Sequence, residues 1–300
     1  MSHAGTAGLP KPSALLRAYE KGKGGAVAAE PAKGRPWWRP TTTGVTIRIS
    51  AAVVLVAVAV GAVALLRRPP SRPDGLVLLY GDSLSAEAAP AFVDELARTT
   101  DAEVIVRAVP AEAPCDARDE MQEDLALRPT VVVIQFVGNS ATPCTLDPAG
   151  ERLEGRALVD RTAQDVRAAT ELFATNGSRV VLVGGPDVPG LPGNPGLGVA
   201  EAYNELVNEW AGRDLGRVRY ADAAATVTGP DHAFTEALPC RHDEGEAEGC
   251  TDGRVVVRSE DRIHFCPQEV EGLACPVPSP GARRFGLEMA RVTRMALGDY

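Results

Sequence analysis

The hydrophobic pattern of residues 75–300 alternates between short apolar runs and longer amphipathic stretches. Runs rich in valine, leucine and isoleucine predict buried strands at 76–80, 104–106, 130–137, 180–183 and 218–221. Apolar residues at helical spacing predict helices at 87–99, 116–127, 159–173, 199–211 and 280–296, the last with Ser279 as its cap. Strands that alternate with helices predict a three-layer α/β/α fold around a parallel five-stranded sheet, with ligands at the carboxyl ends of the strands.

A separate apolar segment precedes this pattern. Residues 49–66 are eighteen positions without a charge, bounded by Arg48 and by Arg67 and Arg68. Such a run is long enough to cross a hydrocarbon layer of about 30 Å, and we predict a transmembrane helix. A cleaved signal peptide is the less favoured interpretation because the basic region ahead of the run is too long. A buried core helix is disfavoured because the run has no polar face.

The charge distribution divides the chain further. Residues 1–48 carry eight basic and two acidic side chains and show no sustained period, which predicts a disordered basic tail. Residues 67–74 form a linker rich in proline and arginine, and 75–300 form one domain. The basic residues ahead of the apolar run place the amino terminus in the cytoplasm. Residues 73–300 hold twenty arginines against thirty-eight acidic residues, which argues against a nucleic-acid partner.

All six cysteines follow the predicted span, so the sequence places them outside the cell, where disulfides persist. We therefore predict a single-pass protein of the cell membrane with an extracytoplasmic domain. Six cysteines allow 15 pairings, and the sequence does not decide among them. The preferred pairs join loops after neighbouring strands or close short loops: Cys115–Cys144, Cys240–Cys250 and Cys266–Cys275. A zinc site is the competing use, but no C-x-x-C pair is present.

Three short motifs carry candidate chemistry. Gly81-Asp82-Ser83 follows the first strand, Gly138-Asn139 follows the third, and Asp261 and His264 precede the last helix. Each motif is weak alone, since three letters recur by chance. Together and in this order they resemble the SGNH, or GDSL-type, serine hydrolase family, over residues 75–298.

The resemblance implies an SGNH hydrolase-like fold with a flavodoxin-like sheet. It also implies Ser83 as nucleophile, His264 as base and Asp261 as its acidic partner, with no metal and no cofactor. The oxyanion hole would use the N–H of Ser83 and the amide of Asn139. His232 and His242 each lie beside an aspartate and are interpreted instead as surface residues.

The chain departs from the family pattern at one place. The family has a glycine after the second strand, whose N–H completes the oxyanion hole, but residues 109–115 contain none. The N–H of Ala111, Glu112 or Ala113 would replace it, and we choose Ala111. The turn there favours glycine, because a residue with a Cβ rarely adopts positive φ.

The expected function is a serine esterase that hydrolyses acyl esters. By resemblance, the substrates would be O-acetyl groups on a cell-envelope glycan, or a small ester. One alternative is a cell-surface O-acyltransferase that uses the same serine. The other is a catalytically weak or inactive surface binding module, favoured by the missing glycine.

Overall fold

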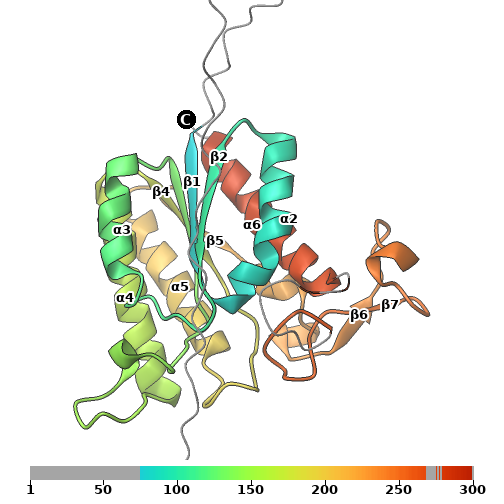
Figure 1. Ribbon diagram of the computed structural model, residues 1–300. Helices are drawn as coiled ribbons and strands as arrows, with labels where there is room; N and C mark the ends of the chain where they lie inside the picture. Colours follow the sequence, from blue (N-terminus) through green and yellow to red (C-terminus); the bar gives the residue numbers. More distant parts are fainter. Residues whose placement is uncertain (1–74, 268–274, 276, 278, 299–300) are drawn as a thin grey trace, which may run out of the picture. The chain divides into compact units, whose positions relative to one another are not determined.

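The computed structural model describes residues 75–267, 275, 277 and 279–298 (Figure 1). The predicted tail at 1–48, the predicted transmembrane helix at 49–66 and the linker at 67–74 lie outside this part. Within the described ranges, no helix combines the length and apolarity that a membrane crossing requires.

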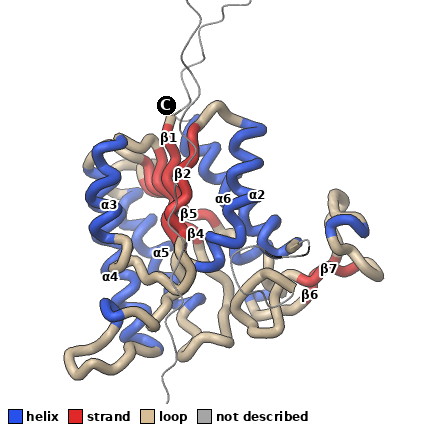
Figure 2. The backbone as a smooth tube through the Cα atoms, in the orientation of Figure 1, coloured by secondary structure: helices blue, strands red, loops and turns tan. Residues whose placement is uncertain are grey.

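A parallel five-stranded sheet lies at the centre of the described part (Figure 2). Its strands are β1 (Leu76–Gly81), β2 (Glu103–Ala108), β3 (Val131–Gln135), β4 (Arg179–Val183) and β5 (Val218–Ala221), in the spatial order β2-β1-β3-β4-β5. This is the flavodoxin-like order, so the predicted fold class is confirmed for the described residues. The order reverses between β1 and β3, which are neighbours, and their carboxyl ends therefore meet at one edge.

Helices cover both faces of this sheet (Figure 1). One face packs against α2 (Ser83–Thr99) and α6 (Pro280–Gly298), and the other against α3 (Arg118–Asp124), α4 (Gly155–Thr175) and α5 (Gly196–Ala211). Side chains alternate along β1, with Val77 and Leu79 on the first face and Leu78 and Tyr80 on the second. All four are fully buried, as expected for a strand covered on both sides.

Helix caps explain where two helices begin. We predicted α2 from Glu87, but it begins at Ser83, because the Asp82 carboxylate accepts a hydrogen bond from the Leu84 N–H at 3.0 Å. The predicted start of α6 is correct: Ser279 Oγ accepts from the N–H of Ala282 at 3.3 Å. The earlier start of α2 matters because it places Ser83 in the first turn of a helix.

Residues 237–256, between β5 and α6, form an arm that the hydrophobic pattern did not predict. It carries a hairpin of β6 (Ala237–Pro239) and β7 (Arg254–Val256), drawn at the right of Figure 1. Arg284 on α6 anchors the arm through a buried ion pair with Glu244, in which Nε donates to the carboxylate at 2.7 Å. Strands of three residues are too short to give a periodic signal.

Three disulfides cross-link the described part. They join Cys115 to Cys144, Cys240 to Cys250 and Cys266 to Cys275, which are the three predicted pairs. The first joins the loops after β2 and β3, and the second closes the arm. Disulfides are rare in the reducing cytosol, so they favour an oxidising compartment.

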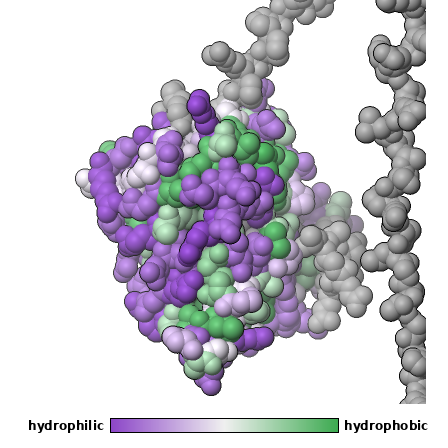
Figure 3. Space-filling model, turned by 60° about the vertical axis from the view of Figure 1, so that its left-hand side comes forward, coloured by the Kyte–Doolittle hydropathy of each residue, from purple (hydrophilic) through white to green (hydrophobic). Residues whose placement is uncertain are grey.

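Hydrophilic residues dominate the face of the molecule in Figure 3, and hydrophobic residues gather there in smaller patches. The large hydrophobic side chains that stay exposed come from separate elements, among them Val109 after β2, Leu215 after α5 and Val256 on β7. Scattered exposed side chains of this kind are usual on globular proteins and indicate no particular partner.

Candidate active site

Ser83 lies where β1 turns into α2. The preceding Gly81 closes the strand and packs against β3: a Cβ there would overlap Ser85 Oγ and lie 2.6 Å from the Gln135 carbonyl oxygen. Only glycine fits such a close approach without moving the backbone. Ser83 is then the first residue of α2, at the helix end where unpaired N–H groups and the helix dipole favour negative charge.

Asp82 connects the turn at Ser83 to the end of β3. Its Oδ1 accepts from the Leu84 N–H at 3.0 Å, and its Oδ2 accepts from the Val137 N–H at 2.7 Å. The side chain is fully buried, and burial raises the pKa of Asp82 to about 6 against the opposing effect of these bonds. Asp82 therefore has a structural role, because its two hydrogen bonds join the start of α2 to the segment that leads to Asn139.

The structure brings Ser83, His264 and Asp261 into one hydrogen-bonded chain. His264 Nε2 lies 2.9 Å from Ser83 Oγ, and His264 Nδ1 lies 2.5 Å from Asp261 Oδ2. The Asp261 carboxylate accepts a hydrogen bond from Nδ1–H of the neutral imidazole. Nε2 then carries no proton and accepts a hydrogen bond from the serine hydroxyl. The side chains of His264 and Asp261 are 35% and 31% exposed, so the chain of bonds is open to a ligand from solvent.

The loop holds Asp261 as a carboxylate. Asp261 Oδ1 accepts from the N–H of Ile263 at 2.8 Å, from the N–H of His264 at 3.0 Å and from the Ser259 hydroxyl. Burial raises the pKa of Asp261, but its hydrogen bonds with His264 and Ser259 outweigh burial and hold the pKa well below the usual range. An ionised acid that is fixed in place can orient the imidazole and stabilise its positive charge.

The pKa of His264 is shifted in the opposite direction. The hydrogen bond to Asp261 raises it, burial opposes the shift, and the negative charges of Glu87 and Asp82 add to it. His264 therefore stays protonated to a higher pH than a free histidine. A base that accepts a proton from serine gains strength from such an environment.

Arg258 holds the loop that carries Asp261 and His264 through hydrogen bonds to its backbone. The sequence did not predict this role. The Arg258 guanidinium is buried and donates to the carbonyl oxygens of Ile263 at 2.9 Å and Arg262 at 3.1 Å, and to that of Asp187 at 2.9 Å. Burial lowers the pKa of Arg258 to about 10, so the side chain remains a cation near neutral pH. The loop after β4 also packs closely against the Asp261 loop, because a Cβ on Gly190 would overlap the carbonyl oxygen of Asp261.

Asn139 lies beside the loop that follows β2. Its Nδ2 donates to the carbonyl oxygen of Glu112 at 3.0 Å. A carboxamide nitrogen carries two hydrogens, so one remains for a second acceptor. The disulfide between Cys115 and Cys144 joins the same two loops, which keeps the predicted oxyanion donors on one edge of the sheet.

The hydrogen bonds of the β2 loop distinguish among the three candidate donors. The N–H of Glu112 donates to Val109 O at 3.3 Å, and that of Ala113 donates to Asp116 Oδ2 at 2.9 Å. Among the described residues, no acceptor takes the N–H of Ala111. Ala111 also adopts φ of 64°, the conformation that glycine favours, in a chain that has alanine there. The free N–H favours Ala111 as the third donor.

Replacing Ala111 with glycine is expected to raise the free energy of unfolding by about 1 kcal/mol, because alanine is strained at positive φ. The N–H is unchanged, so kcat should stay within about threefold of the parent value. Thermal unfolding and ester turnover measure the two effects. Ala113→Gly is the control: Ala113 is buried without positive φ and should lose stability as glycine. A lower melting temperature for Ala111→Gly would contradict the prediction.

One group of potential metal ligands occurs among the described residues, formed by Cys115, Asp116 and Cys144. The two sulfurs are joined in a disulfide and are not available as thiolates. This cluster therefore supplies no metal site.

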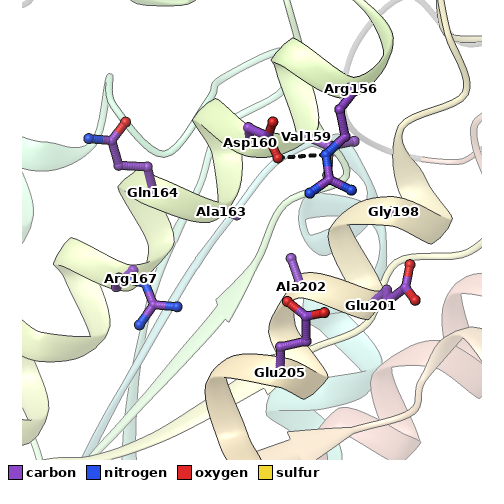
Figure 4. A pocket seen from close by; sticks show the side chains of 10 residues that line it. All are labelled: Arg156, Val159, Asp160, Ala163, Gln164, Arg167, Gly198, Glu201, Ala202 and Glu205. Carbon is purple, nitrogen blue, oxygen red and sulfur yellow. Dashed lines mark hydrogen bonds and ion pairs between the residues drawn. The ribbon is translucent and has the colours of Figure 1, made fainter. Parts of the chain in front are cut away.

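A polar pocket lies between α4 and α5 (Figure 4). Arg156 and Asp160 on α4 form an ion pair at 2.7 Å there, and Glu201 and Glu205 come from α5. The residues that line it include no serine, cysteine or histidine, so it offers no nucleophile or imidazole base. The Ser83 site is therefore the stronger candidate for chemistry.

No protein-family model and no curated protein matches the chain. Among solved structures, it is similar to an acetylxylan esterase from Geobacillus stearothermophilus, with 13% identity and a TM-score of 0.45 over 75% of this chain and 94% of that one. It is similar to the psychrotrophic esterase EstA from Pseudoalteromonas sp., with 14% identity and a TM-score of 0.43 over 74% and 98%. A GDSL-like lipase from Bacteroides thetaiotaomicron shows 12% identity and a TM-score of 0.44 over 75% and 89%.

These similar structures are described as esterases and as a lipase of the GDSL type, the family that the sequence motifs resemble. Their identities of 12–14% and TM-scores of 0.43–0.45 transfer neither a substrate nor a residue role to this chain. A functional assignment must therefore rest on the arrangement of Ser83, His264 and Asp261 themselves.

Proposed function

We propose that this chain is a serine hydrolase of carboxylic esters, of the SGNH or GDSL type. The observation that carries the proposal is the chain of contacts from Ser83 Oγ to His264 Nε2 at 2.9 Å and from His264 Nδ1 to Asp261 Oδ2 at 2.5 Å. A serine hydroxyl is a weak nucleophile until a neighbouring base takes its proton, and this geometry supplies such a base and its orienting acid.

In the proposed reaction, Ser83 Oγ attacks the ester carbonyl while its proton passes to His264 Nε2. The oxyanion accepts hydrogen bonds from the N–H of Ser83, the N–H of Ala111 and Asn139 Nδ2. The imidazolium returns the proton to the leaving alcohol, and an acyl-serine forms. Water then attacks the acyl carbon while His264 takes its proton. The bond to Ser83 Oγ breaks, the imidazolium returns the proton to that oxygen, and the carboxylic acid is released.

The proposed substrates are acyl esters, and O-acetyl groups on a cell-envelope glycan are the preferred class. We further propose that residues 49–66 tether the domain to the membrane, with the domain on the extracytoplasmic side. The three disulfides support an oxidising location. An enzyme held beside the envelope would meet glycan esters at high effective concentration.

The full chain, incubated with p-nitrophenyl acetate and with O-acetylated oligosaccharides, should release nitrophenol or acetate at a rate above that of buffer. Longer p-nitrophenyl esters then define the acyl length. Adding an unmodified oligosaccharide as acceptor separates hydrolysis from acyl transfer, because transfer lowers the yield of free acetate. A chain inert toward the whole set would refute the esterase and favour a surface binding module.

The pH dependence of kcat/KM should follow the neutral form of His264. Its pKa is raised above the ordinary value of 6.5, chiefly by the hydrogen bond to Asp261, so protonation removes the base at a higher pH than usual. Activity is therefore low in acid and rises with a midpoint above pH 6.5. Rates measured from pH 4 to 9 at constant ionic strength test this. A midpoint below 6.5 would contradict it.

A further inference from the structure

Glu87 is a partly buried acid that the proposed reaction does not use. It lies on α2 four positions after Ser83, and its Oε2 accepts from the N–H of Phe265 at 2.8 Å and from the N–H of Cys266 at 3.1 Å. These two residues directly follow His264 in the chain. A single carboxylate oxygen thus holds the backbone of the segment that carries the proposed base.

Residues four apart lie on the same face of a helix, about 6 Å apart along its axis. Ser83 contacts the imidazole of His264, and Glu87, one turn further along α2, contacts the backbone that follows it. The two contacts span 178 to 181 residues of sequence. Two contacts on one rigid helix face fix both the position and the direction of the segment.

Glu87 also contributes to the negative charge around His264, in addition to holding the backbone. Asp261 from its own loop, Glu87 from α2 and Asp82 from the end of β1 all place negative charge toward the imidazole. Arg258 donates to the carbonyl oxygens of this loop, and its positive charge interacts with Asp261 and Glu87. Burial raises the pKa of the Glu87 carboxyl, against the effect of its two N–H donors. Of the three acids, Glu87 neither caps α2 nor bonds the imidazole directly.

Resting on the proposed serine hydrolase, we propose that Glu87 is a positioning residue. Its oxygen aligns His264 with Ser83 through the backbone N–H groups of Phe265 and Cys266, and its charge stabilises the imidazolium that forms when Ser83 loses its proton. A merely structural acid would do the first and have no effect on the protonation of His264.

Two substitutions separate the oxygen from the charge. Glu87→Gln keeps an acceptor oxygen and removes the charge, so kcat at the alkaline plateau should stay within about threefold while the acid limb of the pH profile moves to lower pH. Glu87→Ala removes both, so kcat should fall by about tenfold or more with little change in KM, because Glu87 does not touch the ester. Glu95→Gln is the matched control, since Glu95 lies on the same helix and pairs with Arg98 at 2.8 Å. Glu95→Gln should change neither kcat nor the position of the acid limb.

A second readout does not depend on turnover. The proton resonance of the His264 ring, assigned by its loss in His264→Ala, is titrated in the full chain and in Glu87→Gln. A lower midpoint in Glu87→Gln than in the parent and in Glu95→Gln supports the proposal, whereas an unchanged midpoint overturns it. Should Glu87→Gln fail to fold, the parent carries the test. The amide protons of Phe265 and Cys266 report the pH at which the Glu87 carboxyl titrates, and the His264 ring resonance must show a second inflection at that pH; its absence overturns the proposal. A parent chain without esterase activity would refute the function and leave this titration to decide the role of Glu87.

Discussion

Replacing Ser83 with alanine is expected to reduce kcat for ester hydrolysis by about 10⁴-fold or more, with KM nearly unchanged. The substitution removes the atom that would form the acyl-enzyme, and no other hydroxyl contacts His264 Nε2 among the described residues. The residual rate would come from the oxyanion donors and from substrate binding. Release of nitrophenol by the parent and the variant at equal concentration gives the ratio.

Ser85→Ala is the matched control for this change. Ser85 lies two residues further along α2, is buried, and donates to Gln135 Oε1 at 2.6 Å. Its loss should lower stability by about 1 kcal/mol and leave kcat within about threefold. Equal activity of the parent and Ser83→Ala would exclude Ser83 as the nucleophile.

Replacing Asp261 with asparagine is expected to lower kcat by about 10³- to 10⁴-fold, because an amide favours the wrong tautomer of His264 and no longer stabilises its positive charge. The hydrogen bond to Asp261 is also the main cause of the raised pKa of His264, so the midpoint of its titration should fall. Steady-state rates across pH and the titration of the imidazole measure both effects.

Asp243→Asn is the control for the loss of a carboxylate. Asp243 lies beside the exposed His242 and pairs with Arg283 at 2.8 Å, so it repeats the pairing of an aspartate and a histidine on the surface. Its substitution should leave kcat unchanged. A loss for Asp243→Asn equal to that for Asp261→Asn would reassign the base to His242.

Local signals in the sequence predicted much of the fold. Buried strands such as β3 and β4 are continuous apolar runs, and the start of α6 is marked by Ser279 and Pro280. The start of α2 was set too late, because the cap by Asp82 depends on side-chain geometry and the first turn has no apolar period. The hairpin of β6 and β7 was missed because three-residue strands give no alternation.

In the candidate site, too, contacts between residues close in sequence were predicted and contacts that depend on the tertiary fold were not. Asp261 and His264 are three residues apart, so their contact is encoded locally, and the resemblance to a family predicted that Ser83 would join them. Arg258 and Glu87 bind backbone groups that only the tertiary fold brings to them, and no spacing in the sequence identifies the backbone groups that they bind. The position of Glu87 four residues after Ser83 was the one available signal, since it places both on one helix face.

Covalent labelling of the full chain with an alkyl fluorophosphonate tests the central claim most directly. The reagent reacts with a serine hydroxyl activated by a base, and peptide mass spectrometry then locates the adduct. We expect one stoichiometric adduct on Ser83 in the parent chain, and its loss in His264→Ala. An adduct on another serine, or labelling of Ser83 that persists without His264, would contradict the proposed catalytic site.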